Sequence, residues 1–454
     1  MLIESVFELD GFPTLHGTLA KIANWFISSA RRPHRESAYI TALSFGSVVC
    51  ARFFSFEESY STCYMCVSAD TGVGKEDLRT AATKMSQSLE CMQLIMNVSS
   101  FTSDAGVHAA IVTQPQSLAL IDEFGKVFEA MSSSVLSQTA LTTLTIAFTT
   151  AHTALPPKGY ADVGGAQTAA KYQTVQRPAM SLLVFGTPRE ITKNLTPEAF
   201  TSGEFSRFLF FEIPGDVVRP NPEYQPVPID VIKALADILK VHNSLNNEIF
   251  IRGCDDVEPA TKCGVESGID TTEIDIRYQR ERAAAKDTTS KALITRRFEK
   301  AKRLSIIISL LGTDTPPNLT NPIITHAALD DAILIVEKSD KMVKSWIRNQ
   351  SSYPDNYIEL ADQMAEYIEN ELCGTSKLAV SQTELSKKFP EYSHKNTSAR
   401  RDIWELLSDR GITVRQEGRG RTNAYFFEIY ENAGDVDDNI RLVEAINARK
   451  KVRV

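Results

Sequence analysis

The sequence predicts an α/β fold in which helices connect the strands of a parallel sheet. Apolar runs of strand length recur along the first half of the chain, at Thr62–Ser68, Leu118–Ile121, Ser181–Phe185 and Phe208–Ile213. Helical or irregular segments separate these runs, and a glycine-containing loop follows the first of them. Strands that alternate with helices favour a sheet with a parallel core.

Length and composition exclude several classes of protein. The chain has 454 residues, of which 43% are hydrophobic and 23% charged, which excludes a disordered chain, a collagen-like repeat and a small disulfide-stabilised domain. One hydrophobic core rarely grows beyond about 250–300 residues, so we expect two to four folded units. The formal charge of −8 excludes a globally basic DNA-coating protein but not a local basic surface.

The cysteines and the apolar segments indicate a reduced, cytoplasmic protein. Seven cysteines, an odd number, do not describe a disulfide framework. The first residues are acidic where a signal peptide is basic, and the apolar stretch from Ala38 to Phe54 is interrupted by polar residues, so we expect no membrane segment. Cys63 and Cys66 form a CxxC pair without a second pair at zinc-site spacing, and we expect both thiols in the core.

The apolar spacing also places the main helices. Leu15, Leu19, Ile22 and Phe26 recur at helical spacing after Pro13, which predicts an amphipathic first helix. We expect a second, more apolar helix over Ser37–Val49. Beyond a proline-rich exit from the sheet, helical patterns return at Ile229–Val241 and Ala292–Leu311.

A glycine-containing loop, Ala69-Asp-Thr-Gly-Val-Gly-Lys-Glu76, lies between the first strand and a helix. Glycines there let backbone N–H groups converge on phosphates, and the helix N-terminus adds positive potential. The candidate nucleotide-binding residues are Thr71, Gly72, Val73, Gly74, Lys75 and Glu76, of which Lys75 would reach the β- and γ-phosphates. Glu76 departs from the pattern, because a Ser or Thr usually offers Mg²⁺ a hydroxyl at this position. Its carboxylate either binds the metal instead or repels the nucleotide.

Four polar residues next to later strands fit the same chemistry. Asp122 and Glu123 end an apolar strand, so Asp122, with Glu76, is a candidate metal ligand and Glu123 a candidate base for an attacking water. Thr187 ends the next strand and suits a sensor of the γ-phosphate. Arg207 directly precedes the last strand and would neutralise charge at a neighbouring subunit's nucleotide, although a structural arginine is the plain alternative.

In this order, these elements resemble the P-loop ATPase domains of phage, plasmid and mobile-element replication proteins. The resemblance covers about residues 10–340 and includes the ADTGVGK loop, SLALIDEFG, SLLVFGTPRE, SRFLFF and RRFEKAKRL. It implies an AAA+ or RecA-like P-loop NTPase core that uses ATP and Mg²⁺. It also implies a homo-hexameric ring helicase that acts on single-stranded or duplex DNA, with a primase or another replisome protein as a partner. The roles of Lys75, Asp122, Glu123, Thr187 and Arg207 follow from it.

Two further regions are candidates for contacts with nucleotide or DNA. In the RRFEKAKRL helix, Arg297, Lys300 or Arg303 could serve as a second nucleotide sensor, with a solvated basic helix face as the alternative. A polar insertion between the second and third strands carries Lys158, Tyr160 and Lys171. In a ring ATPase such a loop faces the pore and grips DNA, and the alternative is a surface loop.

The C-terminal part predicts a winged helix, with helices around Leu360–Leu372, at Thr383–Phe389 and at Thr397–Ser408. Strands at Ile412–Arg415 and Tyr425–Ile429 then flank a glycine-arginine hairpin. Lys395, Arg400 and Arg401 near the start of the third helix, and Arg419 and Arg421 in the hairpin, are the candidate DNA contacts. Many winged helices bind proteins instead, which leaves that alternative open.

Together these patterns predict five regions and two competing functions. The regions are N-terminal helices (1–58), a P-loop ATPase core (59–216), a helical lid (217–350), a winged helix (356–430) and a tail (431–454). The favoured function is an ATP-dependent, ring-forming DNA helicase or translocase in phage or mobile-element replication. The alternative is a non-enzymatic DNA-binding replication initiator or helicase loader in which ATP only promotes assembly, and Glu76 favours it.

Overall fold

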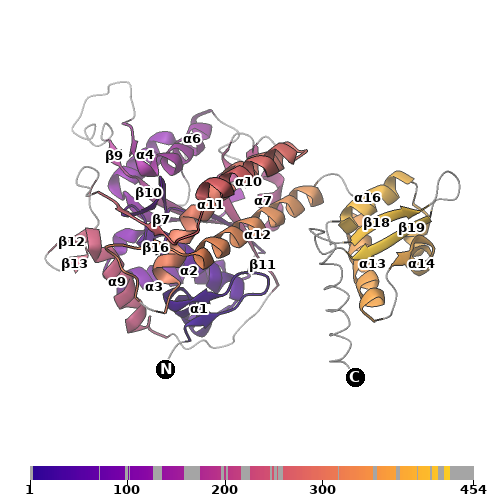
Figure 1. The fold of residues 1–454 in the computed structure, drawn as a ribbon, viewed down its shortest axis with the longest axis horizontal. Coiled ribbons are helices and arrows are strands. Elements are labelled where there is room, and N and C mark those ends of the chain that lie inside the picture. The colour runs from indigo at the N-terminus through magenta and orange to yellow at the C-terminus, as the bar shows by residue number, and fades with distance from the viewer. Residues whose placement is uncertain are drawn as a thin grey trace. The chain divides into compact units, whose positions relative to one another are not determined.

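The computed structural model divides the chain into two compact units, Met1–Lys344 and Ser345–Val454 (Figure 1). It describes the chain except for residues 1–3, 71, 98–100, 102, 126–134, 158–173, 196–198, 201–202, 216–224, 246–247, 250–252, 254–258, 315, 351–354, 375–378, 396, 409–411, 418–423 and 430–454. Among the described residues, no helix is both long and apolar enough to cross a membrane. The finer division of the first unit into N-terminal helices, core and lid stays a prediction.

A five-stranded parallel sheet forms the centre of the first unit. Its strand order is β11 (Phe208–Ile213), β5 (Tyr64–Ala69), β10 (Ala179–Gly186), β7 (Gln116–Ile121) and β6 (Ile95–Asn97). The four predicted strands are present, and the predicted α/β class with a parallel sheet is confirmed. Strand β6 was not predicted, because three residues at the edge of a sheet are too short to give a pattern.

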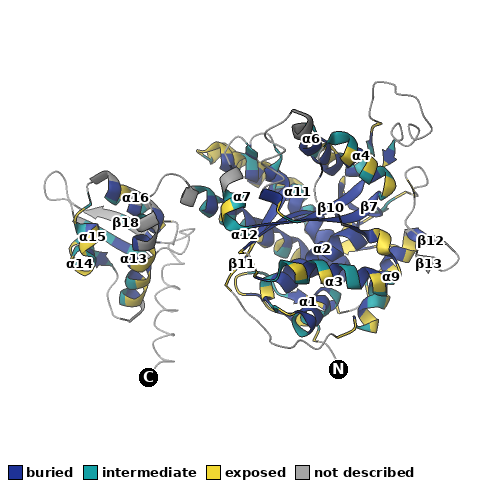
Figure 2. Ribbon diagram, turned by 180° about the vertical axis from the view of Figure 1, so that it is seen from behind, coloured by how far each residue is buried: buried dark blue, intermediate teal, exposed yellow. Residues whose placement is uncertain are grey.

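Helices cover both faces of this sheet (Figures 1 and 2). The face with α1 (Gly17–Ser29), α2 (Arg35–Val49) and α3 (Lys75–Ser88) lies opposite the face with α4 (Asp104–Thr113) and α6 (Val135–Thr149). Every residue of α2 from position 37 onward is buried, which explains why its sequence is apolar without a polar face. Parallel strands buried on both faces read as continuous apolar runs, as these do.

Longer helices complete the first unit. They are α9 (Ile229–Asn243), α10 (Thr271–Ala284), α11 (Thr288–Leu311) and α12 (His326–Gln350), with α7 (Pro188–Asn194) after β10. Short strands pair around them: β1 (Val6–Phe7) with β2 (Leu15–His16), β3 (Phe54–Phe56) with β4 (Ser59–Tyr60) and β14 (Thr261–Lys262), β8 (Ala154–Leu155) with β9 (Val175–Gln176), β12 (Ser244–Leu245) with β13 (Glu248–Ile249), and β15 (Gly264–Val265) with β16 (Ile323–Ile324). Cys63 and Cys66 are buried, as predicted, and burial raises the pKa of both thiols.

Three basic residues of α11 are buried, so the interpretation of Arg297, Lys300 and Arg303 as a solvated helix face is wrong. Arg297, Lys300 and Arg303 are 8%, 2% and 2% exposed. Asp340 of α12 accepts from Arg297 Nε and from Lys300 Nζ, both at 3.0 Å. These partners are far apart in sequence, so the pattern of α11 alone could not reveal the ion pairs.

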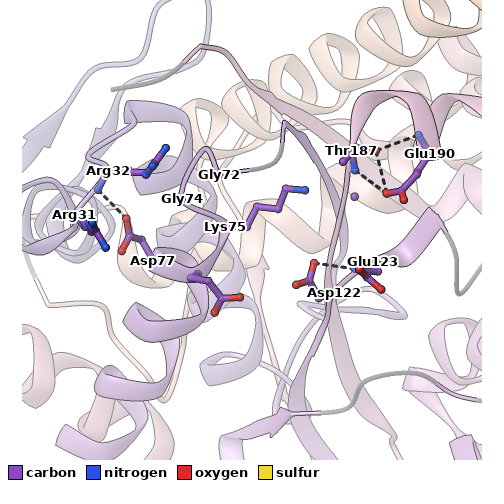
Figure 3. Close-up of a pocket in the computed structure, with 12 residues that line it drawn as sticks. Arg31, Arg32, Gly72, Gly74, Lys75, Asp77, Asp122, Glu123, Thr187 and Glu190 are labelled. Carbon is purple, nitrogen blue, oxygen red and sulfur yellow. Dashed lines mark hydrogen bonds between the residues drawn. The ribbon is translucent and has the colours of Figure 1, made fainter. Parts of the chain in front are cut away.

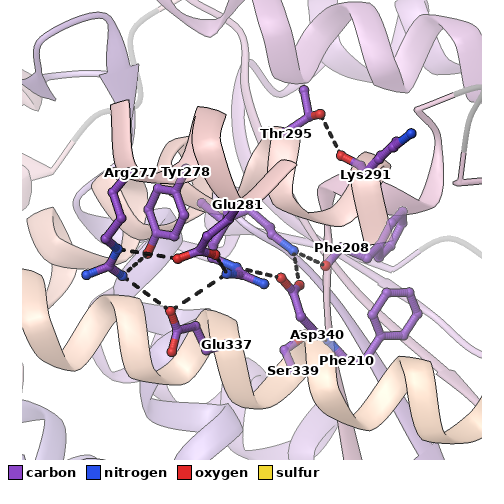
Figure 4. Close-up of polar contacts among 12 residues, drawn as sticks. Phe208, Phe210, Arg277, Tyr278, Glu281, Lys291, Thr295, Glu337, Ser339 and Asp340 are labelled. Carbon is purple, nitrogen blue, oxygen red and sulfur yellow. Dashed lines mark hydrogen bonds and ion pairs between the residues drawn. The ribbon is translucent and has the colours of Figure 1, made fainter. Parts of the chain in front are cut away.

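Side chains of α11 and α12 also form hydrogen bonds with the backbone of β11, the edge strand of the sheet (Figure 4). Lys300 Nζ donates to the Phe208 carbonyl at 3.3 Å, and the Phe210 N–H donates to Ser339 Oγ at 2.7 Å. Two backbone groups on the outer side of β11 are thereby satisfied by side chains of α11 and α12. This arrangement covers a sheet edge that would otherwise expose unpaired backbone groups.

The second unit has the predicted winged-helix order. Its elements are α13 (Asp355–Gly374), β17 (Val380–Ser381), α14 (Gln382–Lys388), α15 (Pro390–Ser393), α16 (Thr397–Ser408), β18 (Ile412–Glu417) and β19 (Ala424–Ile429). The strands form an antiparallel sheet in the order β17-β19-β18. Leu360, Ile368, Ile403 and Phe427 are fully or almost fully buried in its core. The short elements β17 and α15 were not predicted.

Candidate functional site

The glycine-containing loop joins the carboxyl end of β5 to the first residue of α3, Lys75. Gly72 and Gly74 have φ angles of +89° and +99°, a region that favours glycine. A Cβ at Gly74 would also lie 2.7 Å from Arg32 Cβ, so that position has no room for a side chain. The loop therefore has the backbone form of a phosphate-binding loop at a helix N-terminus. Thr71 lies outside the described residues.

A pocket of about 470 Å³ opens around this loop (Figure 3). Its lining residues are Arg31, Arg32, Gly72, Gly74, Lys75, Glu76, Asp77, Asp122, Glu123, Gly186, Thr187 and Glu190. Lys75 extends from the loop toward the side that carries Asp122 and Thr187, whereas Arg31 and Arg32 lie on the other side (Figure 3). The pocket thus brings together the predicted phosphate-loop, carboxylate and sensor residues, because β5, β7 and β10 end at the same edge of the sheet.

The carboxylates after β7 have a constrained geometry. The Glu123 N–H donates to Asp122 Oδ1 at 2.8 Å. Glu123 has a φ of +52°, which is rare for a residue with a side chain. Such backbone strain clusters at functional sites, where the surrounding structure maintains it.

Lys75 combines partial burial with several nearby acids. Burial lowers its pKa, and the negative charges of Asp122, Glu190, Asp70 and Glu123 oppose that shift without cancelling it. The ammonium is therefore less stable here than in water. A polyphosphate in the pocket would supply the negative charge that favours it.

The residues present fit Mg²⁺ held together with a nucleotide. Magnesium usually binds through one or two carboxylates, several waters and the substrate's phosphates. Asp122 and Glu76 line the same pocket, and Glu76 lies in the first turn of α3. Among the described residues, no group of three or more His, Cys, Asp or Glu side chains is arranged to hold a metal ion. The metal would thus depend on the nucleotide for the rest of its ligands.

Thr187 lies at the end of β10, as predicted, but its hydroxyl has a local partner. Thr187 is the N-cap of α7 and forms a capping box with Glu190, a role that the sequence interpretation missed. The T-x-x-E spacing before a helix is the signal that indicates such a box. Glu190 lines the pocket beside Thr187.

Arg207 lies at the amino-terminal ends of the strands, whereas the pocket lies at their carboxyl ends. It precedes β11, whose first residue, Phe208, pairs with Tyr64 at the start of β5. Its side chain is held within the chain: Nη1 donates to the Gly203 carbonyl, and Nη2 donates to Thr149 Oγ1 at 3.2 Å. Arg207 is 5% exposed, and burial together with Arg296 lowers its pKa to about 10. It does not line its own chain's pocket.

Arg31 and Arg32 were missed as site residues. They lie between α1 and α2 and line the pocket with the phosphate loop. Asp77 Oδ2 accepts from the Arg32 N–H at 2.8 Å, which ties this connection to α3. Adjacent arginines ahead of Pro33 were a weak signal, because only tertiary packing brings them to the loop.

The structure describes three of the eight candidate DNA-contact residues. Lys158, Tyr160, Lys171, Arg419 and Arg421 lie outside the described residues. The guanidinium of Arg400 donates hydrogen bonds to the carbonyls of Tyr392 and Ser393 within the same unit. Lys395 Nζ lies 4.2 Å from the centre of the Tyr357 ring, and Arg401 is exposed.

Comparison with known proteins gives a weak likeness to solved structures. No known family matches the sequence, and no curated protein matches it. Among solved structures, the chain is similar to the Aeropyrum pernix ORC1 protein in complex with DNA, at 12% identity over 82% of this chain and 84% of that one, with a TM-score of 0.22. At this identity and TM-score, the match supports no conclusion about this chain. The fold class follows from the strand topology, and the proposed function follows from the pocket.

Proposed function

We propose that the first unit binds and hydrolyses ATP with Mg²⁺, as an ATPase of the AAA+ type. The observation that carries the proposal is the pocket itself. Lys75, Asp122, Glu123 and Thr187 come from three separate strand ends and line one cavity beside a phosphate loop. Charged side chains that converge in a pocket, one of them a lysine whose pKa is lowered by burial, are typical of functional sites.

The chemistry would be attack of water on the γ-phosphorus. Lys75 binds β- and γ-phosphate oxygens, and Mg²⁺, when bound with the nucleotide, neutralises part of their charge. Glu123 accepts a proton from the water as its oxygen forms the new bond to phosphorus. The bond from the γ-phosphorus to the bridging oxygen breaks, and ADP leaves with that electron pair.

We further propose that the protein is an ATP-dependent DNA-binding factor of the replication initiator or loader type. The winged-helix unit supports DNA binding, since Arg401 on α16 is exposed near the end that would enter a groove. Arg207 is buried in the chain, as are Arg297, Lys300 and Arg303 of α11. That burial favours nucleotide-dependent assembly over a ring built for rapid turnover.

A ring-forming helicase is the second candidate, and the location of Arg207 favours it. This arginine lies at the amino-terminal ends of the strands, away from the pocket of its own chain. It could therefore contact only a nucleotide bound to a neighbouring subunit. Serving as such a group would require Arg207 to leave Gly203 and Thr149. Homo-hexamer formation and contact with a primase belong to this candidate.

The test is ATP hydrolysis by the full chain with and without single-stranded or duplex DNA, together with strand displacement. The initiator or loader predicts ATP-dependent duplex binding with slow turnover and no strand displacement. DNA-stimulated turnover with strand displacement, lost in Lys75→Ala, would establish the helicase instead. Absence of nucleotide binding by the wild type would overturn both candidates.

A further inference from the structure

The Thr187 hydroxyl donates a hydrogen bond to the Glu190 carboxylate, and both residues line the pocket. Thr187 Oγ1 donates to Glu190 Oε2 at 3.0 Å, and the Thr187 N–H donates to the same oxygen at 3.3 Å. In return, the Glu190 N–H donates to Thr187 Oγ1 at 3.4 Å. A threonine hydroxyl has one proton to donate. While the capping box is closed, that proton is committed to Glu190.

Close packing holds Glu190 in this place. A Cβ at Gly125 would lie 2.4 Å from Glu190 Cβ, so the chain beyond Asp122 and Glu123 passes directly against the start of α7. Gly186 packs in the same way, since a Cβ there would lie 2.8 Å from Ile191. The start of α7, which carries Glu190, is therefore packed against the chain beyond β7 and against the end of β10.

We propose that Glu190 is a positioning residue of the nucleotide site, which holds the Thr187 hydroxyl until a terminal phosphate replaces Glu190 as the acceptor of its hydrogen bond. The inference rests on the proposed nucleotide binding. A γ-phosphate near Lys75 would present an anionic oxygen to Thr187 and repel the Glu190 carboxylate. The Thr187 hydroxyl would then donate its hydrogen bond to the phosphate instead of to Glu190, and the capping box of α7 would lose the half that the Glu190 side chain supplies.

This exchange makes the site respond to the terminal phosphate. A diphosphate lacks the oxygen that competes with Glu190, so the capping box stays closed when it binds. With a triphosphate, the Thr187–phosphate bond forms at the expense of the Thr187–Glu190 bond, and the gain in affinity is small. A variant without the Glu190 carboxylate keeps the donor free and gains the full bond.

The experiment measures the ratio of dissociation constants for ADP and a non-hydrolysable ATP analogue with the full chain. Glu190→Ala should raise the preference for the triphosphate by about fivefold to tenfold over wild type, which is within the net value of one ordinary hydrogen bond. Glu190→Gln retains an acceptor for the capping box and isolates the effect of charge. The preference should not rise when Glu190→Ala is added to Thr187→Val, because no hydroxyl remains to exchange.

The wild-type chain supplies a second readout that needs no variant. Backbone amides from 187 to 194 should exchange hydrogen faster with the triphosphate analogue than with ADP, because only the former opens the cap. Equal exchange with both nucleotides, or a ratio within twofold of wild type in Glu190→Ala, would overturn the inference. Those outcomes leave nucleotide binding intact, whereas failure of both nucleotides to bind would remove the proposed function as well.

Discussion

Asp77 accepts a hydrogen bond from the Arg32 backbone N–H at 2.8 Å, which joins the helix of the phosphate loop to the connection between α1 and α2. The bond spans 45 positions of sequence and lies at the rim of the pocket. Gly74 meets Arg32 at the same place. The connection between α1 and α2 therefore contributes residues to the pocket, while the two helices pack against the sheet.

Asp77→Ala should weaken nucleotide binding without removing it. Losing the acceptor leaves the Arg32 N–H without this partner and releases the loop that presents Arg31 and Arg32, so we expect a threefold to tenfold higher dissociation constant, about 1 kcal/mol. Titration calorimetry with an ATP analogue measures it. Gln87→Ala, at an exposed position on the same helix, is the control. An unchanged constant in Asp77→Ala would remove the loop from the site.

Asp340→Ala should destabilise the first unit strongly. It leaves Arg297 and Lys300 buried without the carboxylate that they share, and breaking a buried ion pair costs about 3–5 kcal/mol. Chemical denaturation followed by circular dichroism gives the free energy of unfolding. Asp330→Ala, an exposed aspartate on the same helix, should change it by less than about 0.5 kcal/mol. Similar losses in the two variants would contradict the buried network.

Glu299 should make stability depend on acid pH. Burial favours its neutral form, but Arg303 and Arg296 outweigh burial and lower its pKa below the ordinary 4.5. Because the folded pKa lies below the unfolded one, its contribution is present above about pH 4.5 and is lost as the pH falls through the folded value. Glu299→Gln should therefore reduce the stability difference between neutral and acidic pH, whereas Glu58→Gln should not. Unfolding free energies measured across pH 3–7 decide it, and identical pH profiles for Glu299→Gln and wild type would refute this role.

Arg400 and Arg401 are neighbours in sequence with opposite expected effects. Arg400 donates to two carbonyls of its own unit, so Arg400→Ala should lower thermal stability. Arg401 is exposed on α16, so Arg401→Ala should weaken DNA binding by roughly threefold to tenfold and leave stability unchanged. Fluorescence anisotropy with duplex DNA and thermal melts separate the two. If Arg401→Ala binds DNA as tightly as wild type, α16 is not the contact helix.

Much of the site could be predicted because its residues follow strands. Asp122 and Thr187 each come after a continuous apolar run, and parallel strands bring such ends to one edge. Glu190 was readable in principle from the T-x-x-E spacing after the third run. The same residue, Thr187, fits two roles in the sequence: the N-cap of a helix and a polar residue at the end of a strand.

Other features depend on contacts that no local pattern encodes. Lys300 is buried because Asp340 lies beside it, a partner 40 positions later. Arg31 reaches the pocket because α1 and α2 pack next to the phosphate loop. From the sequence, Arg207 is expected to contact a neighbouring subunit. In the structure, its guanidinium donates hydrogen bonds to Thr149 and Gly203 of the same chain. In each case, tertiary packing decides the role of a charged side chain.

The central claim is that Lys75 and its pocket bind a nucleoside triphosphate, and calorimetric titration of the full chain with an ATP analogue and Mg²⁺ tests it most directly. The expected result is one nucleotide bound per wild-type chain and a loss of at least about tenfold in affinity for Lys75→Ala, which removes a charged hydrogen-bond donor to the phosphates. Equal binding by the two proteins, or no binding by the wild type, would contradict the account.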